Sequence, residues 1–125
     1  MPITVTNIKY HKQQAKLEIT FSNQLTANLS AEFLRVHSPS AEVQGHHPSQ
    51  ATLVTNKQNV QIDSIQPVGN YAIKLNFNDG HDTGLYSWQY LYKLASKQQQ
   101  LWQIYLEKLK QNKSHRDPLI PIKEL

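Results

Sequence analysis

The sequence predicts an α+β fold, with an antiparallel sheet of about five or six strands, one short helix and a long C-terminal helix packed on it. Two periodicities predict this fold class. Before residue 78, apolar residues alternate with polar ones in several short segments, as in strands with one buried and one wetter face. After residue 87, apolar residues recur at steps of three and four, as along one side of a helix. The apolar stripe of that helix is the expected cover for the sheet.

The first 30 residues predict a three-stranded meander. Apolar side chains alternate within residues 3–10, 17–21 and 25–29, and polar turns separate these segments. Ser30 then suits the N-cap of a short helix over residues 31–36, because its hydroxyl can accept a hydrogen bond from a free backbone N–H of the first turn. Pro39 prevents this helix from continuing.

Residues 38–58 lack apolar periodicity and predict a loop, with at most one short strand at Leu53 and Val54. A second strand pair follows. Its first strand starts at Val60, residues 67–70 form the bend, and residues 71–77 return. Asp79 and Gly80 then favour a turn that ends the strand. The order of the strands in the sheet stays open.

Ser87 is a suitable cap for the long helix, which we expect to run for about 22 residues, or about 33 Å. Pro118 and Pro121 rule out a helix near the C-terminus, where we expect an extended tail. At 125 residues the chain fits one domain. We therefore assign residues 1–113 to the domain and residues 114–125 to the tail.

Cysteine is absent, which excludes disulfides, thiolate metal sites, cysteine-ligated clusters and thiol nucleophiles. The N-terminus lacks the pattern of a secretory signal, and no stretch is apolar for long enough to cross a membrane. We expect a cytoplasmic protein without a membrane partner.

The net charge of +4 comes from the C-terminal third. Residues 93–125 carry seven basic and three acidic side chains, whereas the two signs balance before them. Lysines on an amphipathic helix usually form a solvated face. Nucleic-acid binding would need a denser basic patch with exposed aromatic residues, so we expect no nucleic-acid partner and favour a protein partner.

The turn after the predicted return strand holds the first candidate site, in which His81 stands near Asp79 and Asp82. An imidazole beside two carboxylates can hold a metal ion, act as a general base, or bond backbone groups and fix the turn. We favour the third reading, because polar turn clusters commonly serve backbone geometry.

Aromatic side chains at Tyr86 and Trp88, followed by Tyr90 and Tyr92, form the second candidate. They either line a ligand or partner pocket or pack in the core and its rim, and packing is favoured. Arg35 can clamp a carboxylate or phosphate with its guanidinium, or pair with an aspartate of the turn. Pairing is favoured.

Three segments carry a resemblance to a known family. Residues 31–40, 65–71 and 75–91 closely resemble the gamma-butyrobetaine hydroxylase-like N-terminal domain, and residues 79–88, DGHDTGLYSW, are the most specific part. The resemblance covers roughly residues 3–94. In the hydroxylases this domain precedes a separate oxygenase domain that performs the chemistry, so the resemblance implies no hydroxylase activity here.

The resemblance also implies a zinc site, which in the hydroxylases consists of three cysteines and the histidine that corresponds to His81. The cysteine positions here are Ser38, Ser40 and Val43. Because serine is a poor ligand and valine is none, we expect the zinc site to be absent. A replacement site, with His81 joined by an aspartate and by His37, His46 or His47, would suit zinc or iron.

No sequence motif of an enzyme occurs, and a non-haem iron oxygenase would need a second domain. We therefore expect a non-catalytic binding or adaptor module that presents residues 79–88 to an unidentified protein partner, without a cofactor. The resemblance extends to a domain appended to P-loop iron–sulfur carriers, which implies an accessory role in metal-cofactor or redox-enzyme assembly. The alternative is a small protein that binds zinc or iron through His81. The oligomeric state stays open.

Overall fold

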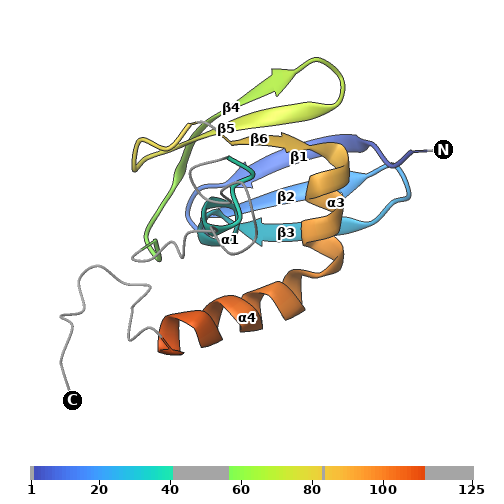
Figure 1. Cartoon of the computed structure of the whole chain (residues 1–125). Coiled ribbons are helices and arrows are strands. Elements are labelled where there is room, and N and C mark those ends of the chain that lie inside the picture. The colour runs from blue at the N-terminus through green and yellow to red at the C-terminus, as the bar shows by residue number, and fades with distance from the viewer. Residues whose placement is uncertain (1, 41–56, 83, 112–125) are drawn as a thin grey trace.

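The computed structural model describes residues 2–40, 57–82 and 84–111. It confirms the α+β class, with six strands and three helices in the described residues (Figure 1). The strands form two three-stranded antiparallel sheets, of order β1-β2-β3 and β4-β5-β6. The bounds are β1 Val5–His11, β2 Lys16–Phe21, β3 Thr26–Ser30, α1 Ala31–Val36, β4 Ile62–Val68, β5 Ala72–Phe77, β6 Leu85–Ser87, α3 Trp88–Ser96 and α4 Gln98–Gln111.

The first sheet is the predicted meander. Leu17 pairs with Leu29, and Ile19 pairs with Ala27, so that the apolar residues of neighbouring strands lie side by side. A bulge between Val5 and Asn7 shifts the register of β1 against β2. An extra residue moves every later side chain to the opposite face. The bulge therefore explains why the apolar positions of β1 change phase between Val5 and Ile8.

The second sheet contains the predicted strand pair and one strand that the sequence did not predict. Ile65 of β4 pairs with Leu75 of β5, and Pro67 is tolerated because β4 is an edge strand of this sheet. The additional strand, β6, pairs with residues 72–74 of β5. We expected a polar turn leading directly into the helix. The three residues of β6 are too few to show an alternating pattern.

Two serine caps were predicted correctly. The Ser30 hydroxyl accepts a hydrogen bond from the Phe33 backbone N–H at 3.0 Å, and the Ser87 hydroxyl accepts one from the Tyr90 N–H at 3.1 Å. Each begins a helix where the sequence placed one. Gly80 adopts a φ of +89° in the turn after β5, a conformation that favours glycine.

The prediction of one continuous C-terminal helix was wrong. The helix is interrupted at Lys97, with α3 before it and α4 after it, although no glycine or proline lies nearby. Tertiary contacts account for the bend. The Gln98 side chain donates to the Asn28 backbone carbonyl at 2.9 Å, Trp102 packs near Phe33, and the Tyr105 hydroxyl donates to Glu32 at 2.9 Å. These contacts direct α4 toward α1 and β3.

One core joins the two sheets to α1 and α3. Figure 1 shows α3 crossing the first sheet and α4 running past its β3 edge. Burying each large apolar side chain contributes about 1.5–3 kcal/mol. No helix in the described ranges is both long and apolar enough to cross a membrane. The predicted strand at Leu53 and Val54 and the predicted tail lie outside the described residues. The largest apolar side chains that are completely buried are Leu17, Ile19, Phe21, Leu29, Phe33, Leu34, Leu75, Tyr86, Leu91 and Leu94.

Candidate functional site

The turn after β5 brings the candidate residues to the end of α1. The Phe77 N–H donates to the His81 carbonyl at 3.0 Å, and the His81 N–H donates to Asp79 Oδ1 at 3.1 Å. The Asp79 side chain therefore fixes the turn from within, as Asp commonly does. This part of the prediction, that an aspartate bonds backbone groups of the turn, agrees with the geometry.

Asp79 also binds two cations. Its Oδ2 lies 2.8 Å from Arg35 Nε and 2.6 Å from Lys57 Nζ, and its side chain is 19% exposed although the turn itself lies at the surface. Arg35 is thus paired with the turn, and its Nη1 is buried without a hydrogen-bond partner among the described residues. Burial opposes ionisation of Asp79. The hydrogen bonds from Lys57, the His81 N–H and Arg35 outweigh it and lower the pKa of this carboxyl to about 2.

His81 is enclosed by the segment that follows α1. Its Nε2 lies 2.8 Å from Ser38 Oγ and 3.5 Å from Ser40 Oγ. The exposed fractions are 7% for His81, 0% for Ser38 and 6% for Ser40. The Tyr86 hydroxyl donates to the Leu34 carbonyl and also bonds the Ser38 side chain. We call His81, Ser38, Ser40 and Tyr86 the serine–histidine cluster. Burial raises the pKa of Tyr86 far above its usual range.

Gly84 makes the serine–histidine cluster possible. A Cβ at this position would lie 2.4 Å from Ser38 Oγ, which is closer than real Cβ atoms approach, and 3.2 Å from the Tyr86 ring, which is tighter than most Cβ contacts. Only glycine allows β6 to pass this close to Ser38. The sequence offered a signal that we did not use, a glycine just before a strand where no turn requires it.

Two of the predicted site residues contact neither the serine–histidine cluster nor the Arg35–Asp79 ion pair. Asp82 is exposed and forms no hydrogen bond or ion pair with another described residue. Trp88 lies at the other end of β5 from Asp79, where its indole N–H donates to the Asn70 carbonyl at 2.7 Å. Lys57, which the sequence did not indicate, forms an ion pair with Asp79. No local pattern could reveal a contact between residues this far apart in the sequence.

The serine–histidine cluster does not have the donors that zinc requires. Ser38 and Ser40, at the cysteine positions of the relatives, do reach His81, but neutral hydroxyls are poor zinc ligands and the 2.8 Å contact is a hydrogen bond. The described part of the chain contains no group of three or more His, Asp or Glu side chains arranged to hold a metal. His37 instead donates to the Phe33 carbonyl at 2.9 Å. Val43, His46 and His47 lie outside the described residues.

A serine within hydrogen-bond distance of a histidine also resembles a nucleophile with its general base. Ser38 has no exposed surface, however, so its hydroxyl is enclosed in this structure. The hydrogen bond between Ser38 and His81 connects the segment after α1 to the turn after β5 of the second sheet. The hydrogen bonds of the serine–histidine cluster satisfy polar groups that would otherwise be costly to bury.

Replacing Asp79 with Asn should lower the free energy of unfolding at pH 7 by about 1–2 kcal/mol, less than the full pKa shift would give because solvent screens part of the interaction. The pKa of Asp79 falls from 3.8 to about 2 on folding. As the pH decreases, the unfolded chain therefore takes up this proton at a higher pH than the folded chain does. The difference between wild type and variant should therefore be nearly constant above about pH 5 and shrink toward pH 2. Urea denaturation across pH 2–7 measures it. Asp82→Asn, at an exposed position, is the matched control and should change little at any pH.

Replacing Gly84 with Ala should destabilise the fold by about 1–3 kcal/mol, because the added methyl group collides with Ser38 Oγ. The cost should be smaller in a Ser38→Ala background, where that oxygen is gone. A double-mutant cycle measured by urea denaturation gives the coupling between the two sites. Strictly additive changes in the free energy of unfolding would contradict a steric clash between the two positions.

Comparisons with known proteins agree with this geometry. The family model described as gamma-butyrobetaine hydroxylase-like, N-terminal, matches residues 8–92. Two solution structures determined by NMR are similar over nearly the whole chain. One is 45% identical with a TM-score of 0.82 and covers 98% of this chain and 96% of its own, and the other is 52% identical with a TM-score of 0.81 and covers 99% and 92%.

A crystal structure of a protein of unknown function from Acidithiobacillus ferrooxidans is 33% identical, with a TM-score of 0.63, and covers 74% of this chain and 92% of its own. No functionally curated protein matches the chain. The family model spans the meander, α1, the second sheet and the start of α3, which include the whole serine–histidine cluster. The chain belongs to the gamma-butyrobetaine hydroxylase-like N-terminal domain family.

Proposed function

We propose that this protein is a non-catalytic binding module of the adaptor type, in which the serine–histidine cluster stabilises the fold and the exposed residues around it contact a protein partner. One observation carries the proposal. The imidazole of His81 and the hydroxyl of Ser38, the groups best suited to chemistry, are buried and bonded to each other. The burial of these two groups supports a structural role for them. Recognition of a partner is then the task of the exposed residues.

The partner surface lies on the segment that leaves the turn. Asp82 is exposed, and Leu85 keeps 44% of its surface exposed although it belongs to β6. Leu85 pairs with Lys74 and so lies on the outer face of the second sheet. Tyr71, 58% exposed, follows the β4–β5 bend, and its carbonyl accepts a hydrogen bond from the Trp88 backbone N–H. Exposed apolar side chains among polar ones are suited to protein recognition.

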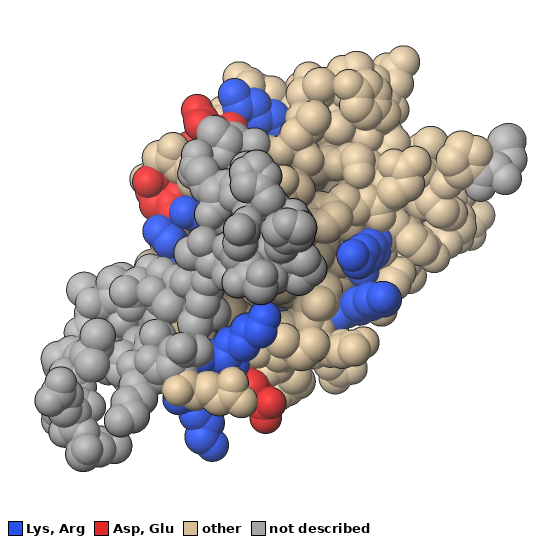
Figure 2. All heavy atoms as spheres, viewed as in Figure 1, with Lys and Arg blue, Asp and Glu red and all other residues tan. Residues whose placement is uncertain are grey.

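The class of partner follows from the family. Relatives of this domain resemble a domain appended to P-loop iron–sulfur carriers, so we place the partner among proteins that assemble metal cofactors or redox enzymes. This step is an analogy at the level of the domain. The basic side chains of α3 and α4, visible as blue patches in Figure 2, favour a partner with an acidic surface.

Replacing Leu85 with Asp should abolish partner binding without unfolding the protein, because an exposed side chain contributes to the interface and little to the core. Quantitative affinity capture from native lysate, followed by mass spectrometry, measures it. Leu25→Asp is a matched control, because Leu25 is 40% exposed and lies at the β2–β3 turn of the other sheet. If both variants retain the same partners as the wild type, β6 is not the contact surface.

The alternative, a zinc or iron protein that uses His81, predicts a different result. Protein purified without a histidine tag would then contain stoichiometric metal that His81→Ala removes. Under the adaptor proposal, His81→Ala should change the melting temperature and leave the metal content unchanged. Elemental analysis and thermal unfolding of the same two preparations therefore distinguish the alternatives.

A further inference from the structure

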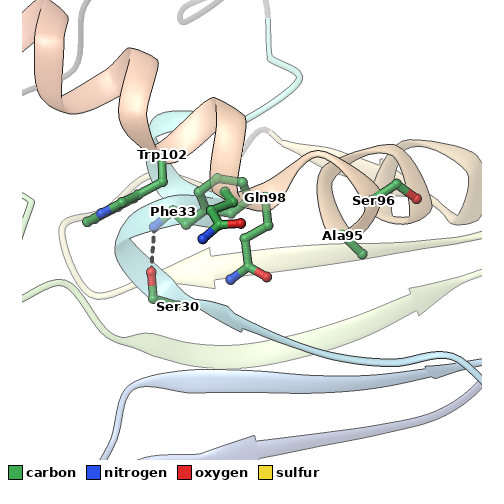
Figure 3. A pocket seen from close by; sticks show the side chains of 7 residues that line it. Ser30, Phe33, Ala95, Ser96, Gln98 and Trp102 are labelled. Atoms are coloured by element: carbon green, nitrogen blue, oxygen red, sulfur yellow. Dashed lines mark hydrogen bonds between the residues drawn. The ribbon is translucent and has the colours of Figure 1, made fainter.

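A cavity of about 570 Å³ lies where α3 ends and α4 begins, apart from the serine–histidine cluster. Figure 3 shows Trp102 and Phe33 at one end of it, Ala95 and Ser96 at the other, and Gln98 between them. This volume falls within the range of about 300–1,000 Å³ that is typical of small-molecule sites. The lining residues are Ser30, Phe33, Ala95, Ser96, Gln98, Gln99 and Trp102.

The bend at Lys97 creates this cavity. The helix interruption turns α4 away from the axis of α3, and the hydrogen bond from the Gln98 side chain to the Asn28 carbonyl fastens the start of α4 to β3. Trp102 is held in turn by Phe33, with ring centroids 6.4 Å apart, and by Tyr105, at 5.2 Å. The lining side chains Gln98 and Trp102 are therefore held by contacts within the protein, as a preformed site requires.

The lining combines aromatic faces with carboxamides and contains no charged side chain. Trp102 is partly exposed and offers a flat apolar surface that favours a planar ring, whereas Phe33 is 1% exposed and packs against Trp102 from the core. Gln98 uses its amide nitrogen on Asn28, which leaves its carbonyl oxygen as an acceptor, and the exposed Gln99 adds a second carboxamide. The hydroxyl of Ser30 is already occupied by the Phe33 N–H. None of these lining residues offers an opposite charge to a charged ligand.

We propose that this cavity binds an uncharged aromatic ligand that carries a carboxamide or a similar group with both a donor and an acceptor. The ring lies against Trp102, and the carboxamide pairs with the glutamine side chains. The site belongs to the α3–α4 bend, so it does not depend on the partner surface around β6.

The probe for this proposal is indole-3-carboxamide, and indole-3-carboxylate is its charged isostere. In a two-dimensional ¹H–¹⁵N NMR titration of the full chain, the carboxamide should shift the Trp102 indole N–H and the side-chain amides of Gln98 and Gln99 saturably. A dissociation constant of about 1 mM or below is expected for a ligand of this size. The Trp88 indole N–H, bound to Asn70 at the far end of β5, should not move.

Two variants locate the site. Gln99→Ala should weaken binding of the carboxamide about threefold to tenfold by removing one hydrogen bond. Gln103→Ala, the same change at an exposed position outside the cavity, should leave the affinity unchanged. Ser96→Tyr should block the cavity and abolish the shifts, and Ser96 is exposed, so the fold should tolerate the change.

Three results would overturn the proposal. They are an absence of saturable shifts at Trp102 up to about 10 mM carboxamide, equal binding of the carboxylate, and equal effects of Gln99→Ala and Gln103→Ala.

Discussion

The fold depends on how the end of α1 is joined to the turn after β5. The two sheets are separate ladders, so other contacts must hold them together. The buried core supplies most of the stabilising free energy but does not fix how the two sheets are oriented relative to each other. Three polar contacts fix this orientation. They are the Arg35–Asp79 ion pair, the hydrogen bond between Ser38 and His81, and the hydrogen bond that the Tyr10 hydroxyl accepts from the Ile62 N–H. Polar contacts between elements distant in sequence thus orient two sheets that share one core.

The local features could be predicted from the sequence because local chemistry determines them. Ser30 and Ser87 each cap a helix, and the meander follows from strict alternation. The pairing of Arg35 with an aspartate of the turn was also predicted. The strand β6 was not, because three residues carry no period. The bend at Lys97 was missed for a different reason, since tertiary contacts override a helical pattern that continues unbroken through it.

The candidate site was only partly predictable. The sequence indicated the His81 turn, and the family resemblance led to Ser38 and Ser40, yet the burial that distinguishes a structural contact from a reactive centre is a property of the packed molecule. Gly84 lies close to Ser38, and Lys57 pairs with Asp79. The spacing of residues in the sequence does not reveal such contacts. The same limit applies to the α3–α4 cavity, since its lining residues come from four separate elements, β3, α1, α3 and α4, around a bend without a sequence signal.

The proline in β4 has a consequence for self-association. An edge strand offers unpaired N–H and C=O groups to which a strand of another molecule can add. Pro67 has no N–H, and a register shift between Ile62 and Ser64 bends the strand around Asp63, which is exposed. The free side of β4 is therefore interrupted at both ends. Edge-to-edge pairing with a strand of another molecule is therefore disfavoured at β4 without any need for a covering element.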